Sequence, residues 1–598
     1  MRRTLAAIGV SGLALFVAGA CADDRPSFVE ENSFVVDASA DAPQCGLRCS
    51  LDGRSILQTC TGEVVETCPP DQACGAARCQ EPCAAAAADK SSNGCEFFLQ
   101  MPQRLKERPQ SCYAAYLVNV STQPVDLALE YKGQALDLSK AVFRTNPDGP
   151  TLTHHTGPIP PGETVVLFVA DRDPNKQRSV AERFFYVGCP EGAVPAYARD
   201  IDQVFTGIGD SFQLKASAPV SAVAIFPFGS AGLSYVTSAT LLLPVTSWAN
   251  EHMIVTAWEQ ANTWKPATQI VAAEDGTEVT VVPTHDIQDG VGVVGTAAKR
   301  PVTYKLDKGQ HLQFHQTESL SGSLVRSNKP TTIFAGHECA NVPTDVGTCD
   351  TLHQQLPPFK QWGHEYVGVG YRPRLGNERE SVAYRIVAAR DGTLLDYDPV
   401  VPRGAPVELA AGEEAVFSSG TGEPFVVRTQ DPEHPIYLAA YMSGGGGDFV
   451  TRRSLSSRGD PDFVNVVPAG QYMSSYSFYA DPTYEDTSLV IVRAKQNGRF
   501  EDVWLECAGT IGAATGEGVG FRPIGNRGEY EFARVDLSKA GGPGDRFGDS
   551  VCRTGLQRMR SEGPFTATLW GWDLAVSYAF TGGMAQRTLV EEPLLPIR

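Results

Sequence analysis

The sequence has few positive charges and, after its first twenty residues, no long hydrophobic run. Lys and Arg number 50 against 69 Asp and Glu, so the formal net charge is −19 at pH 7. No basic patch offsets this excess, which argues against a nucleic-acid or anionic-membrane surface. A transmembrane helix would need about 20 consecutive apolar residues, and the mature sequence has no such stretch. At 598 residues the chain is long enough for several folded cores.

Catalytic and metal-binding patterns are also missing. His337-Glu338-Cys339, with His353 and His364 close in sequence, invites a metal-site interpretation. Neither His337 nor His364 belongs to a His-Glu-x-x-His motif, however, so a zinc helix is not predicted. A structural role is favoured, with the cysteine in a disulfide and the histidines in loop hydrogen bonds. We therefore predict no catalytic residue, no metal ion and no cofactor, and we assign no residue to ligand binding.

Residues 1–20 have the pattern of a secretion signal, with two arginines, an apolar run and then small residues. The stretch Val17-Ala18-Gly19-Ala20-Cys21 resembles a bacterial lipobox, which predicts cleavage before Cys21 and lipid attachment to it. Ordinary signal cleavage, with Cys21 incidental, is the alternative. The acidic residues 21–44 are predicted to form a disordered tether. The protein is thus expected to be exported and held at the outer membrane or cell surface by its lipid anchor alone.

The cysteine count agrees with export. Without Cys21, the fifteen cysteines become fourteen, an even number that favours full pairing in an oxidising compartment. Eight lie in residues 45–95, a segment too short to bury a core alone, so we predict a disulfide-held module. Its connectivity stays open, because eight cysteines allow 105 pairings. Its AAAAAD run, residues 84–89, fits either a short helix or a loop.

The remainder of the chain predicts an all-β body with internal repetition. Asp-Gly turns between alternating apolar residues indicate hairpins at residues 270–282 and 386–398. A strand, a proline-bearing turn and a second strand recur around Pro219, Pro330, Pro435 and Pro564. We predict four repeats of about 100 residues, most simply β-sandwiches, with β-propeller blades as the alternative. The predicted ranges are 96–260, 261–375, 376–485 and 486–598.

Two further features follow from these repeats. The remaining six cysteines are predicted to pair within repeats: Cys112 with Cys189, Cys339 with Cys349, and Cys507 with Cys552. Trp248 and Trp362 each stand four residues after a proline and just before a strand. A binding surface is one interpretation of these tryptophans, but the repeated position favours corners packed against the core.

Residues 443–462, SGGGGDFVTRRSLSSRGDPD, are interpreted as a flexible excursion within the third repeat. The excursion contains Arg458-Gly459-Asp460, which is similar to an integrin-binding tripeptide. Three residues recur by chance, so a polar turn is the preferred interpretation. If the segments after Pro227, Gly336 and Ser443 gather on one face, that face would locate a binding site.

A resemblance adds to this interpretation. IVAAEDGTEVTVVPT, GSLVRSNKPTTIFAGHECANVP and CDTLHQQLPPFKQWGHEYVGV look like segments of the IgGFc-binding protein N-terminal domain family. The cysteine-rich stretch ahead of them is typical of bacterial, myxobacterial-like members. The resemblance implies extracellular binding or matrix association, and it supplies no catalytic residues.

The predicted function is that of a lipid-anchored surface protein without catalytic activity. It would bind an extracellular protein or glycan, or help cells adhere. Two alternatives stay open. One is an extracellular carbohydrate-active or proteolytic enzyme with an unrecognised site, and the other is a protease inhibitor acting through residues 45–95.

Overall fold

The computed structural model describes residues 45–595, except 106–107, 147–148, 179, 181–185, 203–204, 230–235, 261–262, 377 and 516–517. Residues from Leu47 onward form one compact unit. The predicted signal, Cys21 and the predicted tether lie outside the described residues. Within the described part, no helix is both long and apolar enough to cross a membrane.

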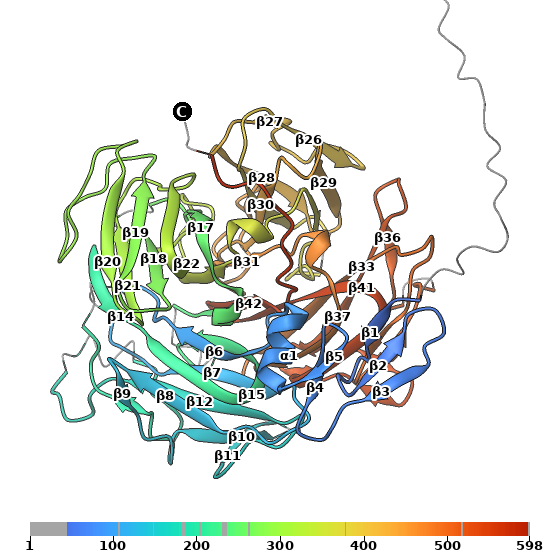
Figure 1. The fold of residues 1–598 in the computed structure, drawn as a ribbon. Helices are drawn as coiled ribbons and strands as arrows, with labels where there is room; N and C mark the ends of the chain where they lie inside the picture. Colours follow the sequence, from blue (N-terminus) through green and yellow to red (C-terminus); the bar gives the residue numbers. More distant parts are fainter. Residues whose placement is uncertain are drawn as a thin grey trace, which may run out of the picture. The chain divides into compact units, whose positions relative to one another are not determined.

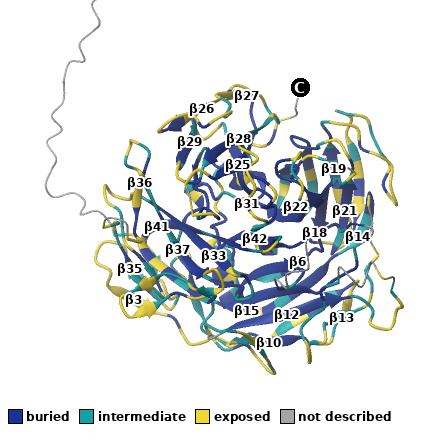
Figure 2. Cartoon of the chain, turned by 180° about the vertical axis from the view of Figure 1, so that it is seen from behind, coloured by how far each residue is buried: buried dark blue, intermediate teal, exposed yellow. Residues whose placement is uncertain are grey.

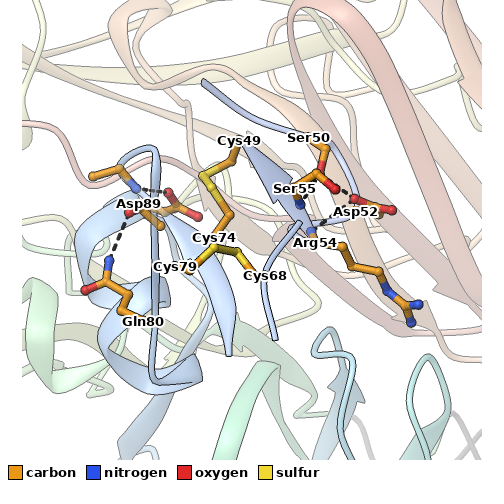
Figure 3. Close-up of a disulfide and its surroundings, with 12 residues drawn as sticks. Cys49, Ser50, Asp52, Arg54, Ser55, Cys68, Cys74, Cys79, Gln80 and Asp89 are labelled. Carbon is orange, nitrogen blue, oxygen red and sulfur yellow. Dashed lines mark hydrogen bonds between the residues drawn. A yellow bond between two sulfur atoms is a disulfide. The ribbon is translucent and has the colours of Figure 1, made fainter. Parts of the chain in front are cut away.

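The cysteine-rich module contains little regular structure besides short strands and one helix. Its strands are β1 (Leu47–Cys49), β2 (Ser55–Gln58), β3 (Val64–Thr67), β4 (Ala73–Gly75) and β5 (Arg78–Gln80). Disulfides join Cys49 to Cys74, Cys68 to Cys79, and Cys83 to Cys95, while Cys45 and Cys60 are also disulfide-bonded. Figure 3 shows the first two of these bonds beside the Ser50–Asp52–Arg54 turn. Disulfides therefore supply much of what a hydrophobic core supplies in a larger domain.

The alanine run forms helix α1 (Pro82–Asp89). Alanine has the highest helix propensity, and Pro82 occupies the first turn, where a missing N–H costs nothing. The Glu81 side chain accepts a hydrogen bond from the Ala84 N–H, and Lys90 ends the helix in the left-handed conformation. The Cys83–Cys95 disulfide then ties α1 to strand β6. The helix was thus one of the two alternatives that the sequence allowed.

The body that follows is nearly all β, as predicted, with 3% of the chain helical and 50% in strands. Figure 1 shows its sheets as successive groups of strands along the chain. The first, ten-stranded sheet contains β6 (Gly94–Leu99), β7 (Tyr113–Asn119), β8 (Leu127–Tyr131), β9 (Gln134–Ala135), β10 (Val142–Asn146), β11 (Gly149–His154), β12 (Thr164–Asp171), β13 (Tyr197–Ala198), β15 (Phe212–Phe226) and β16 (Ser238–Leu241).

The second sheet has eight strands: β14 (Gly207–Asp210), β17 (Ala249–Met253), β18 (Pro266–Ala272), β19 (Thr277–Val282), β20 (Val302–Leu306), β21 (Gln310–His315), β22 (Leu324–Ala340) and β23 (Asp350–Leu356). Two four-stranded sheets follow, built from β24 (Glu365–Gly368), β25 (Ser381–Ala388), β26 (Thr393–Asp398), β27 (Glu408–Leu409), β28 (Glu414–Gly420), β29 (Phe425–Thr429), β30 (Ile436–Met442) and β31 (Asp462–Asn465).

The last large sheet has nine strands: β32 (Met473–Ala480), β33 (Asp486–Ala494), β34 (Val503–Leu505), β35 (Gly509–Ile511), β36 (Arg522–Ile524), β37 (Tyr530–Lys539), β38 (Gly542–Pro543), β41 (Gly555–Asp573) and β42 (Val576–Thr581). The short strands β39 (Arg546–Phe547) and β40 (Ser550–Val551) pair with each other. Three 3-10 turns separate the groups: η1 (Val245–Ser247), η2 (Phe359–Gln361) and η3 (Ala469–Gln471).

A change of strand partners explains the recurrent proline. The first half of β15 pairs with β8 and its second half with β7 and β16, and Pro219 lies at the change of partners. In β22 and β41 the change of partners falls near Pro330 and Pro564. In the third group Pro435 separates β29 from β30, which belong to different sheets. Because proline has no N–H to donate, it is tolerated where a ladder is interrupted.

The two-layer packing is clearest in the third group. Tyr384 and Phe417 come from one four-stranded sheet, and Tyr397 and Phe425 come from the other. The Tyr384 ring lies 5.6 Å from Phe417 and 4.9 Å from Phe425, and all four rings are buried. Aromatic side chains from facing sheets thus fill the space between the layers, as in a β-sandwich.

The last strands of the four groups, β16, β23, β31 and β42, pack on one another and are called the central strands. β16 and β31 each contact both β23 and β42. The Gln354 side chain of β23 donates to the carbonyl oxygens of Ala239 in β16 (2.6 Å) and Ala579 in β42 (3.0 Å). Figure 2 colours this region as buried, whereas exposed residues gather at hairpin tips.

The beginning and end of the body also meet. Ser91 and Ala585 form an antiparallel bridge, and the Ser92 N–H donates to the Met584 carbonyl oxygen over 2.8 Å. The half-barrel sheets agree with the prediction of β-sandwich units. The packing of the central strands on one another is a feature that a β-propeller would share. The division into four repeats stays a prediction. Strand β17 lies within the predicted first repeat but pairs with β22, and it therefore belongs to the second sheet.

Candidate binding face

Three segments that immediately precede central strands lie together and define what we call the loop face. They are residues 341–349 after β22, 443–461 after β30, and 573–575, which begin with the last residue of β41. The packing of β23, β31 and β42 brings these three segments together. Most of the loop after Pro227 lies outside the described residues, so its place on the same face as the segments after Gly336 and Ser443 stays a prediction.

Direct contacts join these segments. The Gly444 N–H donates to the Val342 carbonyl oxygen over 2.9 Å. Farther along the same segment, the Gly459 N–H donates to the Asp573 carbonyl oxygen over 2.8 Å. The Arg452 guanidinium also lies 3.0 Å from the Asp345 carboxylate at the exposed rim. Segment 443–461 therefore touches both of its neighbours.

Arg374 holds segment 443–461 at both ends. Its guanidinium is buried and donates to the carbonyl oxygens of Ser443 (2.7 Å) and Arg458 (2.8 Å). Glu380 neutralises the charge, at 2.8 Å, and accepts a hydrogen bond from the Tyr371 hydroxyl over 2.9 Å. Although burial disfavours the charged guanidinium, the Glu380 carboxylate raises the pKa of Arg374. The segment predicted to be a flexible excursion is thus anchored.

Asp448 fixes the middle of the same segment. One carboxylate oxygen accepts from the Ser381 N–H and hydroxyl, each at 2.7 Å, and the other accepts from the N–H and hydroxyl of Thr451. Burial alone would raise the pKa of Asp448, but these hydrogen bonds outweigh it and lower the pKa. Next in the chain, Phe449 packs edge-on against Trp258. The segment presents a defined shape.

A disulfide joins Cys339 to Cys349 and closes segment 341–349. Inside this loop, the Asn341 side-chain amide donates to the carbonyl oxygens of Val346 (2.6 Å) and Thr348 (3.2 Å). The other body disulfides are Cys112–Cys189 and Cys507–Cys552. All three are the pairs that within-repeat pairing predicts.

Three buried carboxyl groups, from Asp350, Asp460 and Asp462, lie beneath the loop face. Burial raises the pKa of Asp460 to about 7 and raises those of Asp350 and Asp462 well above the usual range. Repulsion from Asp460 and Asp462 raises the pKa of Asp350 further. Asp460 is only 2% exposed, so Arg458-Gly459-Asp460 does not present its carboxylate as an integrin-binding tripeptide would.

The exposed part of the loop face is polar. Thr344, Asp345, Thr451, Arg452 and Arg453 are exposed, and Leu574 adds an apolar residue that is 56% exposed. A rigid, mixed surface of this kind suits protein recognition, because little order has to be imposed on binding.

Comparison with known proteins identifies the family of the chain. The family model described as IgGFc binding protein matches residues 238–571, more than half of the chain. The chain belongs to the IgGFc-binding protein family. It is also 26% identical over 263 residues to the human IgGFc-binding protein, a match that covers 43% of this chain and 4% of the human protein. No solved structure shows a significant match to this chain.

The matched region contains the histidines that invited a metal-site interpretation. Burial lowers the pKa of His337 and of His353 to about 3, so both rings are neutral near pH 7. His337 contacts the Glu259 carbonyl oxygen, and His353 contacts the Gln269 side chain and stacks on Phe334. In the described part of the chain, no group of His, Cys, Asp and Glu is arranged to hold a metal ion.

The two tryptophans have a packing role. Trp248 and Trp362 are 8% and 1% exposed. The indole N–H of Trp248 donates to the Leu243 carbonyl oxygen (3.0 Å), and that of Trp362 donates to the Pro357 carbonyl oxygen (3.2 Å). Each tryptophan ends a 3-10 turn that begins after a proline. They are corners of the core and do not belong to the loop face.

Proposed function

We propose that this chain is an exported binding protein without catalytic activity, which takes an extracellular protein partner on the loop face. We further propose that lipid on Cys21 holds it at the surface of a bacterial, myxobacterial-like cell, where binding serves adhesion. A glycan carried by the partner is a second ligand within this proposal.

The observation that carries the proposal is the anchoring of segment 443–461. A buried Arg374, a buried Glu380 and the hydrogen-bonded Asp448 fix a long, otherwise irregular segment, and its exposed Arg452 pairs with Asp345. Long irregular segments in compact domains are uncommon and usually functional. The histidine and carboxyl side chains considered above, His337, His353, Asp350, Asp460 and Asp462, are all buried, which supports a binding function over a catalytic one.

The partner is tested with immobilised extracellular proteins. Human IgG Fc fragment, a purified mucin and a matrix glycoprotein are coated separately, with serum albumin as the reference. The purified chain is expected to bind at least one of them more strongly than albumin. Equal retention on all four surfaces would reject the proposal.

The anchor is tested with Cys21→Ser in a bacterial host that processes lipoproteins. The unsubstituted chain is expected in the membrane fraction with incorporated fatty acid, and the variant is expected without the lipid. Lipid labelling that is the same in both chains would reject the role of Cys21.

A further inference from the structure

A cleft lies at the ends of the central strands that are opposite to the loop face. We call it the corner cleft and define it by Lys90, Thr246, Trp248, Lys360, Gln361 and Gln586, which line it together with smaller neighbours. It lies where the end of α1 meets η1, η2 and the C-terminal segment, and its volume is about 200 Å³. This is below the roughly 300–1,000 Å³ of sites for drug-sized ligands, so a single ring-sized unit fits.

The cleft contains amide groups that have no partner among the residues that the structure describes. The Gln586 side chain is 7% exposed, and neither its amide nitrogen nor its oxygen has a hydrogen-bond partner among the described residues. Gln361, 5% exposed, donates its amide to the Ser247 carbonyl oxygen over 3.1 Å, but its amide oxygen has no partner within the described part either. Buried polar groups are almost always hydrogen-bonded, and each one left unpaired costs about 1–3 kcal/mol.

The corner at η3 can be compared with the corner at η2. Gln471 holds in η3 the position that Gln361 holds in η2. Its amide nitrogen donates to the carbonyl oxygens of Gln361 (3.2 Å) and Arg587 (2.7 Å), and its oxygen accepts from the Arg587 N–H over 3.0 Å. The repeated corner can therefore satisfy such a glutamine completely. Among the glutamines Gln361, Gln471 and Gln586, the two with unpaired amide atoms in the described part of the chain are the two that line the cleft.

The charge of the cleft differs from that of the whole chain. The chain has a formal net charge of −19, but Lys90 and Lys360 line the cleft and no Asp or Glu does. Both lysines are exposed, and neither ammonium forms an ion pair with any residue that the structure describes. Two cations beside unpaired amides favour a ligand that combines a negative charge with hydrogen-bonding hydroxyls.

We propose that the corner cleft binds an acidic sugar unit, meaning a monosaccharide that carries a carboxylate. Lys90 and Lys360 attract the carboxylate, while the amides of Gln361 and Gln586 bond the ring hydroxyls. Side-chain amides suit this role because each can donate to one hydroxyl and accept from another. The site does not depend on the loop face and can hold a ligand while that face is occupied or free.

The test uses ligand-observed NMR titration of the purified chain with glucuronate, N-acetylneuraminate, glucose and acetate. Glucuronate or N-acetylneuraminate is expected to bind at least about tenfold more tightly than glucose and than acetate. Lys90→Gln with Lys360→Gln is expected to remove this preference, and Gln586→Leu to weaken the acidic sugars with little effect on folding. Lys495→Gln, an exposed lysine outside the cleft, is the matched control.

Three results would overturn the proposal. Glucose or acetate could bind as well as the acidic sugars, or the double lysine variant could keep the preference. A crystal structure grown with glucuronate in excess could also show only ordered water bridging Gln361 and Gln586. Thermal unfolding of each variant establishes that a lost signal reflects the cleft and not an unfolded chain.

Discussion

Arg374 donates two hydrogen bonds to Ser443, from one guanidinium nitrogen to the carbonyl oxygen (2.7 Å) and from the other to the hydroxyl (2.9 Å). Arg374 lies before β25, and Ser443 follows β30 directly. The bond pair thus fixes the point at which the chain leaves the core and enters the loop face. Because Arg374 also reaches the Arg458 carbonyl oxygen, one buried side chain sets both ends of the segment.

Arg374→Met should destabilise the body and release segment 443–461. The substitution leaves the buried Glu380 carboxylate without its cation, a loss of about 3–5 kcal/mol in similar cases. The thermal unfolding midpoint should fall, and amides of residues 443–461 should exchange faster with deuterium than those of the central strands. Arg374→Met combined with Glu380→Gln should recover part of the loss. Unchanged exchange in the segment would contradict the clamp.

The buried carboxyl groups predict stability that falls as pH rises. The pKa of Asp460 is raised from 3.8 to about 7, so the folded state holds this proton more tightly than the unfolded chain does. Its contribution is complete below about pH 4 and is lost as the pH rises through 7. The pKa values of Asp350 and Asp462 are also raised well above 3.8 by burial, so their contributions to stability are lost in the same direction as the pH rises.

The charged and titratable neighbours of this cluster are few. Arg374 favours the ionised form of Asp460, and Tyr484 interacts with Asp350. Asp350→Asn should therefore raise the unfolding midpoint at pH 8 and flatten its dependence on pH between 5 and 8, since one repelling charge is gone. The check is a series of thermal melts across that range. A variant with the same slope as the unsubstituted chain would show that the cluster does not control stability.

Trp362 should matter for stability and not for binding. Its ring is 1% exposed and contacts Phe359 and Tyr437. Trp362→Ala should cost about 3–5 kcal/mol because it opens a cavity in the core. Trp362→Phe should cost less, since most of the volume is kept and only the N–H bond to Pro357 is lost. Chemical denaturation measures both. If a substitution of Trp362 weakened binding without lowering stability, the prediction would be wrong and Trp362 would belong to a binding surface.

The Cys339–Cys349 disulfide should restrain the loop face locally. The two cysteines are 10 residues apart, so removing the bond frees a short loop, with a typical cost of about 2–4 kcal/mol. Replacing both by Ser should accelerate hydrogen exchange in residues 341–349 before it affects the core. The Cys507–Cys552 double serine variant is the control for general loss of a disulfide. Equal exchange in 341–349 for both variants would contradict a local role.

Much of the architecture was predictable from local patterns. Asp-Gly hairpins, repeated prolines and repeated tryptophans report directly on turns, ladder interruptions and corners, because each depends on backbone geometry near one residue. The even cysteine count and within-repeat positions likewise indicated the body disulfides. Pairing within residues 45–95 did not follow, since 105 combinations satisfy the same count.

From the sequence, a shared loop face could be stated only as a condition to be tested. Arg374 and Asp448 carry no local motif, and their roles arise from partners far along the chain, such as Ser443 and Ser381. The glycines of 443–447 indicated flexibility, but tertiary contacts override that propensity. Asp350 and Asp460 meet only when β23 and β31 pack side by side. Gln361 and Gln471 occupy the same position in two successive 3-10 turns, and this recurrence could have drawn attention to the corners. Gln586, which lines the cleft with Gln361, has no such signal in the sequence.

The most direct test of the binding account compares two charge reversals. Arg453 is exposed on segment 443–461. Lys495 is also exposed, but it follows β33, and it is the opposite end of that strand, at Asp486, that lies beside the loop face. Affinity for a protein retained in the immobilised panel is measured by biolayer interferometry for Arg453→Glu and Lys495→Glu. The account predicts that Arg453→Glu weakens binding about tenfold or more while Lys495→Glu changes it less than about twofold. Equal effects, or a larger effect of Lys495→Glu, would contradict it.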